Sequence, residues 1–136
     1  MLFRSVGLLL GLAASGIPVT GVTVRRTKAD QEARVKALLD RTVTELQLDP
    51  RLTDSVVEAD DRFVGPGYGQ PSPGMVEAVR LAAECEGLFL DPVYTGKGFA
   101  GLIQRIREGR YRKDESVVFV HTGGLPGLFV YDEAFA

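Results

Sequence analysis

The segment DPVYTGKGFAGLI, Asp91 to Ile103, joins a cluster of hydrogen-bonding side chains to an apolar pattern with helical spacing. The polar residues, which include Tyr94 and Thr95, come first, so they are expected at the entrance of a helix. In an open parallel sheet, ligands bind beyond the carboxyl ends of the strands, where helix amino termini favour anions. The segment is therefore a candidate ligand-binding loop.

Two further loops combine a polar or aromatic side chain with glycine. GPGYGQPSPG, residues 65–74, carries Tyr68 among four glycines and three prolines, and HTGG runs from His121 to Gly124. Loops of this composition bring the backbone close to a ligand, or they simply connect two elements. No GxGxxG fingerprint or Walker loop is present. By themselves the three loops predict a ligand-binding domain of unknown chemistry.

Each singled-out residue also has a simpler interpretation. Tyr68 can be a surface ring, and Tyr94 a half-buried packing residue with a locally bonded hydroxyl. Thr95 is a plausible helix cap, and Lys97 is most simply a solvated residue in the first turn of a helix. His121 can be a satisfied histidine at the end of a strand.

Helical and buried-strand patterns alternate along the chain, which predicts an α/β domain with a mainly parallel sheet. In the first half of the chain we expect a helix ending at Gly16, a strand over 18–24, a helix capped by Thr27 and a possible strand over 55–65. In the second half we expect a helix over 75–86 ended by Gly87 and a helix from about 95 to Gly109. A buried strand in SVVFVHTGG (116–124) and a final turn or short helix from Leu125 should follow.

The composition excludes several classes of protein. Hydrophobic residues make up 45% and charged residues 25%, and the net charge of -2 gives no reason to expect a nucleic-acid partner. The single cysteine, Cys85, excludes an internal disulfide and is expected to be a small buried residue of a helix. With one histidine far from it, no metal site is expected.

The amino terminus, MLFRSVGLLLGLAASG, mimics a signal peptide, but its apolar run is too short for a transmembrane helix. We favour a buried helix followed directly by the strand, since a mature secreted chain would otherwise start abruptly on a buried strand. A cytoplasmic protein without a membrane partner is therefore expected, and a secreted one is the distant alternative.

Together the segments GLLLGLAASGIPVTGVTV, KADQEARV, GYGQPSPGMVEAVRLAAECEGLFLDPVYTGKGFAGLI and VVFVHTGGLPGLFVY resemble the carboxyl-terminal portion of the D-cysteine desulfhydrase and aminocyclopropane-carboxylate deaminase family. DPVYTGK followed by HTGG is the specific pair. The resemblance implies pyridoxal phosphate as cofactor and an incomplete part of the doubly wound, mainly parallel sheet of the tryptophan synthase β-like fold. Residues 7–136 would be the carboxyl-terminal portion of that domain.

The resemblance also implies roles for individual residues. Tyr94 would lie against the cofactor or substrate, and Tyr68 would approach the substrate from the neighbouring loop, where either phenol could orient substrate or relay a proton. Thr95 would sit near the pyridine nitrogen, and Thr122 and Gly123 would line the cofactor site. An amino acid is the implied substrate, and intact members are commonly homodimers.

Two positions separate the branches of the family. The deaminase branch typically carries glutamate after this tyrosine and leucine after the histidine, whereas this chain has Thr95 and Thr122. It therefore resembles the desulfhydrase branch, which converts D-cysteine to pyruvate, sulfide and ammonia. The alternatives are the deaminase, a related sulfur-amino-acid lyase, and a non-catalytic ligand-binding module.

The lysine that binds the cofactor covalently in this family lies upstream of the matching region, as does the serine next to it. The family's glycine-rich phosphate loop should precede GLLLGL, where MLFRSV stands. None of the four lysines, Lys28, Lys36, Lys97 and Lys113, matches the catalytic one. We expect residues 1–6 to be a non-native start, because LFRS can be encoded by the end of a sequencing adapter. The chain would then be an inactive, aggregation-prone fragment.

Overall fold

The computed structural model describes residues 2–136, and for Leu2 the backbone only. The chain divides into two compact units, Met1–Asp61 and Arg62–Ala136. Met1, part of the expected non-native start, lies outside the described residues. Each unit is described by itself.

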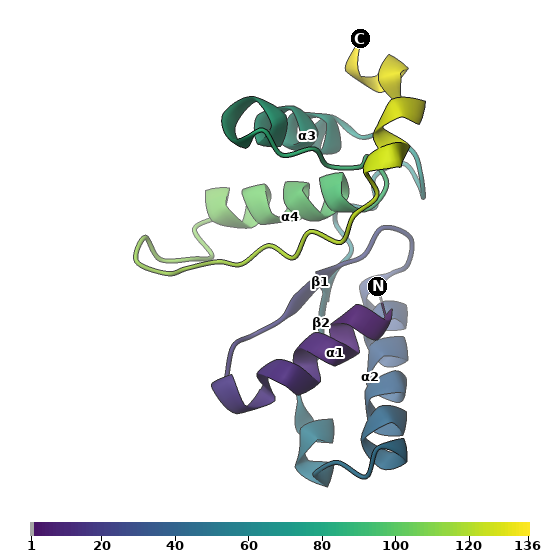
Figure 1. Ribbon diagram of the computed structural model, residues 1–136, viewed down its shortest axis with the longest axis vertical. Coiled ribbons are helices and arrows are strands. Elements are labelled where there is room, and N and C mark those ends of the chain that lie inside the picture. Colours follow the sequence, from purple (N-terminus) through teal and green to yellow (C-terminus); the bar gives the residue numbers. More distant parts are fainter. Residues whose placement is uncertain (1) are drawn as a thin grey trace. The chain divides into compact units, whose positions relative to one another are not determined.

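The first unit holds a parallel pair of strands joined by a helix (Figure 1). Its elements are α1 (Leu2–Leu12), the 3-10 turn η1 (Ala13–Ser15), β1 (Thr20–Val22), α2 (Lys28–Glu45), the 3-10 turn η2 (Pro50–Asp54) and β2 (Glu58–Asp60). Thr20 lies opposite Glu58, and α2 supplies the crossover that a parallel pair requires. The predicted α/β class and the parallel pairing are confirmed.

The core of this unit lies between α1 and α2. Val35, Leu39 and Val43 of α2 are buried against Val6 and Leu9 of α1. The predicted apolar stripe of α2 therefore faces α1, which is itself buried on one side only.

The predicted boundaries of these helices are confirmed. Thr27 caps α2, because its hydroxyl accepts a hydrogen bond from the Asp30 amide at 3.3 Å. At the end of the first helical segment, Gly16 has a φ of 65°, in the left-handed region that glycine favours.

The second unit is built on two packed helices, α3 (Pro73–Glu86) and α4 (Thr95–Arg107), followed by the 3-10 turns η3 (Leu125–Val130) and η4 (Asp132–Phe135). Ser72 caps α3, and Gly87 ends it with a φ of 65°. The buried core consists of Met75, Val79, Ala82 and Leu90, with Phe99, Phe119 and Leu128 packed around it.

A glycine in the first turn of α4 allows the two helices to approach closely. A Cβ on Gly96 would lie 2.8 Å from both the Asp91 carbonyl oxygen and Val79 Cγ2. Real Cβ atoms do not approach other atoms so closely, so this position requires glycine. The entrance of α4 is thereby fixed against α3.

The strand predicted over 116–124 and the predicted burial of Cys85 are both wrong. Residues 116–120 form no strand, and Val118 is 84% exposed, because a strand exists only through pairing and β1 and β2 are the only strands in the described part of the chain. Cys85 is exposed rather than buried, since it lies in the last turn of α3, beyond Ala82, the last buried residue of that helix. Over residues 2–136, no helix is long and apolar enough to span a membrane.

Candidate functional site

The carboxylate of Asp91 organises the entrance of α4. Its Oδ1 accepts hydrogen bonds from the amides of Val93 at 2.9 Å and Tyr94 at 2.7 Å. Its Oδ2 accepts from the Thr95 amide at 2.8 Å and from the Thr95 hydroxyl at 2.7 Å. The side chain is almost fully buried, and an anion is stabilised at the positive end of a helix dipole. Asp91 therefore organises the turn that leads into α4, whose N-cap residue is Tyr94.

Thr95 is buried and bonded to the same residue. Its hydroxyl donates to Asp91 Oδ2 and accepts from the Asp91 amide at 2.8 Å. It is the first residue of α4 rather than its cap, so the simpler interpretation of Thr95 as a capping residue is wrong. Sequence reasoning did not single out the role of Asp91, because it lies before the turn and not at the N-cap position, where Tyr94 stands.

The HTGG turn packs directly on this carboxylate. Gly123 and Gly124 have φ values of 87° and 102°, and a Cβ on Gly124 would lie 2.7 Å from Asp91 Oδ2. His121 holds the turn through both ring nitrogens: Nδ1 accepts from the Gly123 amide at 3.0 Å, and Nε2 lies 3.1 Å from the Phe89 carbonyl oxygen. The interpretation of His121 as a satisfied histidine is confirmed, although no strand precedes it.

The phenols of Tyr68 and Tyr94 meet. Their hydroxyl groups are hydrogen-bonded to each other, and the rings stand edge to face with centroids 6.0 Å apart. Both side chains are about half exposed. Two hydroxyl groups from separate loops thus meet at one partly open place.

Lys97 is fully buried, so its interpretation as a solvated residue is wrong. Its Nζ donates to the carbonyl oxygens of Val64 at 2.6 Å and Gly67 at 2.8 Å. Burial lowers the pKa of this amine below its usual value of 10.5. The burial arises because the loop before Tyr68 folds over α4, a long-range contact that local sequence patterns do not encode.

The structure therefore brings all three candidate loops together in the second unit. Tyr68 contacts Tyr94, the Thr95 hydroxyl binds Asp91, and the turn that contains Thr122 and Gly123 rests on the same aspartate. Thr122 is half-buried in this turn.

Comparison with known proteins identifies the family. Residues 4–123 match the pyridoxal-phosphate dependent enzymes. The chain belongs to this family. The match extends over both units and includes Tyr68, Tyr94, Thr95, Thr122 and Gly123, while Gly124 lies just beyond it.

Relatives within the pyridoxal-phosphate dependent enzymes confirm the resemblance to both branches. The chain is 46% identical over 111 residues to a D-cysteine desulfhydrase of Klebsiella pneumoniae, covering 82% of this chain and 33% of that protein. It is 36% identical over 132 residues to a 1-aminocyclopropane-1-carboxylate deaminase of Burkholderia multivorans, covering 96% of this chain and 39% of that protein. The chain spans about two fifths or less of these relatives.

A solved structure of a homologue of 1-aminocyclopropane-1-carboxylate (ACC) deaminase superimposes with a TM-score of 0.84 at 30% identity. The superposition covers 96% of this chain and 39% of that structure. The chain therefore holds an incomplete part of the family's α/β fold.

Covalent attachment of pyridoxal phosphate requires an amine, and the second unit has two lysine amines. Its two lysines are Lys97, whose Nζ is enclosed by backbone carbonyls, and Lys113, which is exposed in the 111–115 turn. The phenol pair, the hydroxyl groups and the glycine turn suit one side of a pyridoxal phosphate. None of these groups is an amine, so none of them can bind the cofactor covalently as a lysine would.

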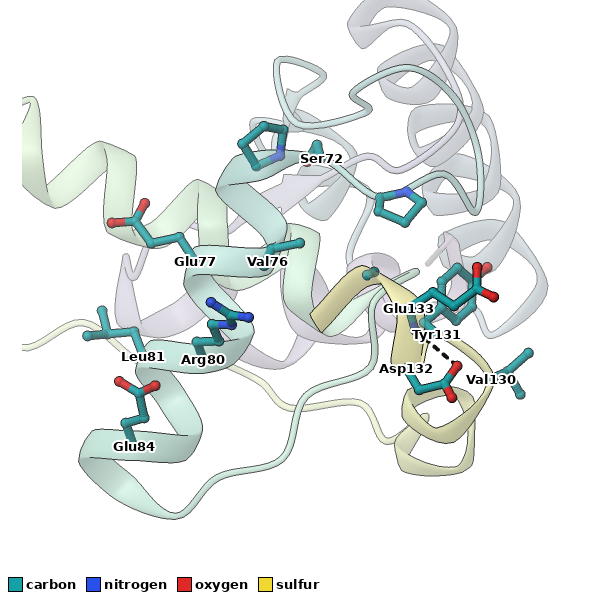
Figure 2. Close-up of a pocket in the computed structure, with 13 residues that line it drawn as sticks. Ser72, Val76, Glu77, Arg80, Leu81, Glu84, Val130, Tyr131, Asp132 and Glu133 are labelled. Atoms are coloured by element: carbon teal, nitrogen blue, oxygen red, sulfur yellow. Dashed lines mark hydrogen bonds between the residues drawn. The ribbon is translucent and has the colours of Figure 1, made fainter. Parts of the chain in front are cut away.

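A large surface hollow of the unit lies elsewhere. Figure 2 shows an open groove of about 1170 Å³ between α3 and the segment Val130–Glu133. Arg80 in this groove donates to the Phe135 carbonyl oxygen at 2.7 Å, and Glu77 is paired with Arg107 on α4. Arg80 and Glu77 are thus engaged with the protein itself. The convergence of polar groups around Asp91 is the better candidate for the site.

Proposed function

We propose that this chain supplies one wall of the cofactor and substrate site of a pyridoxal-phosphate dependent lyase that acts on D-cysteine. The observation that carries the proposal is the contact between the hydroxyl groups of Tyr68 and Tyr94, beside the turn that rests on Asp91. The reaction consumes D-cysteine and water and yields pyruvate, sulfide and ammonia. Pyridoxal phosphate, when bound, withdraws electrons from the substrate's α-carbon.

The chain's own residues would orient the substrate and handle its proton. Tyr68 and Tyr94 are the proposed catalytic residues, since a phenol can hold a carboxylate or thiol and can pass a proton between neighbours. Tyr94, Thr95, Thr122 and Gly123 are the proposed cofactor-binding residues. The positive φ values of Gly123 and Gly124 fit a turn whose backbone closely approaches a ligand.

Thr95 and Thr122 favour the desulfhydrase over the deaminase. The only proton of the Thr95 hydroxyl is donated to Asp91 Oδ2, so toward a pyridine nitrogen this group can only accept a hydrogen bond. A neutral acceptor holds that nitrogen protonated less strongly than a glutamate would. The electron sink would therefore be weaker than in the deaminase branch.

The runner-up function is aminocyclopropane-carboxylate deamination or a related sulfur-amino-acid lyase reaction. It is supported by the relative from Burkholderia multivorans and by the solved homologue, each of which covers 96% of this chain. A non-catalytic ligand-binding module is the third candidate. It is supported by the engagement of Lys97 with backbone carbonyls, which leaves that amine unsuited to covalent chemistry.

A chimera tests the leading proposal. The 127 residues that match the Salmonella newport D-cysteine desulfhydrase at 44% identity would replace their counterpart in that enzyme. Sulfide and pyruvate release from D-cysteine would be measured beside ammonia release from 1-aminocyclopropane-1-carboxylate, with the parent enzyme as control. Activity on D-cysteine that falls in the Tyr94→Phe chimera supports the proposal. Activity on the cyclopropane substrate alone contradicts it.

We also propose that the 136-residue chain is inactive by itself and that the whole protein is a cytoplasmic homodimer. Absorbance of the purified chain with added pyridoxal phosphate tests inactivity. A visible band that borohydride abolishes would reveal a lysine-bound cofactor and contradict it. Sedimentation of the chimera tests the dimer, and fractionation of cells tests the location.

A further inference from the structure

We propose that Lys97 is a positioning residue that holds the turn carrying Tyr68 and thereby sets the Tyr68 phenol opposite Tyr94. This inference rests on the proposed function in one respect only, namely that the Tyr68 phenol faces the substrate. The positioning itself follows from contacts within the second unit.

The two acceptors of Lys97 lie at the base of this turn. Its Nζ donates to Val64 O at 2.6 Å and to Gly67 O at 2.8 Å, and Gly67 immediately precedes Tyr68. The Gly67 carbonyl also accepts from the Gln70 amide at 3.2 Å, which closes a turn over residues 67–70. A single carbonyl oxygen therefore closes the Tyr68 turn and binds the lysine, so a shift of that oxygen shifts the phenol.

The other half of the phenol pair comes from the same helix. Tyr94 stands at the entrance of α4, held through its amide by Asp91, and Lys97 follows in the first turn. The entrance and the first turn of α4 thus hold both Tyr94 and the loop that delivers Tyr68. This arrangement explains how two half-exposed rings on separate loops keep their hydroxyl groups in contact.

The cost of burying Lys97 fits positioning better than simple stabilisation. Removing an ammonium group from water is unfavourable unless hydrogen bonds compensate for it, and burial lowers the pKa of Lys97. An apolar side chain of similar length would fill the space without this cost. It would not, however, bind two backbone carbonyls and fix the turn.

The test uses the full chain with 3-fluorotyrosine at its four tyrosines, each ¹⁹F resonance assigned by a Tyr→Phe variant. Lys97→Met is compared with Lys113→Met, which removes the same charge from an exposed turn. We expect Lys97→Met to shift the Tyr68 and Tyr94 resonances and to leave the Tyr111 resonance unchanged. Hydrogen exchange of the Gln70 amide should accelerate about tenfold or more, as expected for losing a hydrogen bond to a charged group. Lys113→Met should change neither the Tyr68 and Tyr94 resonances nor the hydrogen exchange of the Gln70 amide.

Unchanged resonances and unchanged Gln70 exchange in folded Lys97→Met would overturn the inference. Lys97→Gln, which keeps a donor on a shorter stem, serves as the second variant and should give a smaller acceleration. If neither variant folds, Lys97 holds the whole unit rather than this turn, and the inference is wrong.

A second readout separates this inference from the proposed function. In the chimera, Lys97→Met should lower kcat in the same direction as Tyr68→Phe, and the double variant should lose no more than Tyr68→Phe alone. Additive losses would show that Lys97 acts by another route. A chimera inactive on every substrate would refute the proposed function and leave the fluorine and exchange results to decide the role of Lys97.

Discussion

Gly124 lies directly on the carboxylate of Asp91, so close that a Cβ on this glycine would be 2.7 Å from Oδ2. The same carboxylate accepts four hydrogen bonds from the Val93–Thr95 segment. One buried side chain therefore joins the helix entrance to the HTGG turn. The geometry of both loops depends on it.

Gly124→Ala should destabilise the chain more than Gly123→Ala. Both positions have positive φ, where alanine is strained by about 1–2 kcal/mol, but only at Gly124 does the new Cβ also collide with Asp91. Overpacking of this kind adds about 1–3 kcal/mol. Urea denaturation of the two variants measures the difference. Equal losses would mean that the turn moves freely away from Asp91.

Asp91→Asn should lower the free energy of unfolding by about 2–4 kcal/mol, since an amide group would face donors that now bind a charged acceptor. Asp132→Asn is the matched control, because Asp132 is exposed and accepts one hydrogen bond from the Glu133 amide. That change should stay within about 0.5 kcal/mol. A neutral result at Asp91 would refute its role in organising the entrance of α4.

Gly96→Ala and Gly98→Ala should have opposite effects, although both glycines lie in α4. At Gly96 the Cβ would lie 2.8 Å from a backbone oxygen and from Val79, which should cost about 1–3 kcal/mol. At Gly98 the nearest atom to a Cβ belongs to Phe119, at an ordinary 3.5 Å, so the higher helix propensity of alanine should stabilise by up to about 1 kcal/mol. Thermal unfolding distinguishes the two. Stabilisation at both positions would exclude the close packing of α3 on α4.

The stability of the chain should depend on pH through Lys97. Its pKa is lowered by burial in the folded state, so the unfolded chain binds more protons between that lowered value and the usual 10.5. The contribution of Lys97 therefore increases the free energy of unfolding as pH rises through this interval. The increase should be smaller in Lys97→Met than in wild type and unchanged in Lys113→Met. Parallel pH profiles for wild type and Lys97→Met would contradict the shift.

The features that the sequence predicts correctly are those that local patterns encode. The helix over 75–86 follows from its apolar spacing and from Gly87, and the cap of α2 follows from Thr27. The three candidate loops were identified because glycine and polar side chains mark them. Their meeting around Asp91 follows from tertiary packing.

The failures have a common physical origin in long-range contacts. Burial of Lys97 requires the loop at 64–67 to cover α4, and nothing in the pattern of α4 signals that cover. The predicted strand over 116–120 has the right side chains, but strand structure depends on a neighbouring backbone. Cys85 is likewise exposed because the tertiary packing that covers α3 ends before it, with Ala82 as the last buried residue of the helix.

The double hydrogen bond between Thr95 and Asp91 constrains how this site could evolve. A glutamate at position 95 would remove a hydroxyl that both donates to and accepts from the aspartate. It would also add a second negative charge beside a buried carboxylate, which is electrostatically unfavourable. A glutamate at position 95 would therefore have to turn its carboxylate away from Asp91, and Asp91 Oδ2 would need another donor. A change of side chain at this position would thus also change the helix entrance.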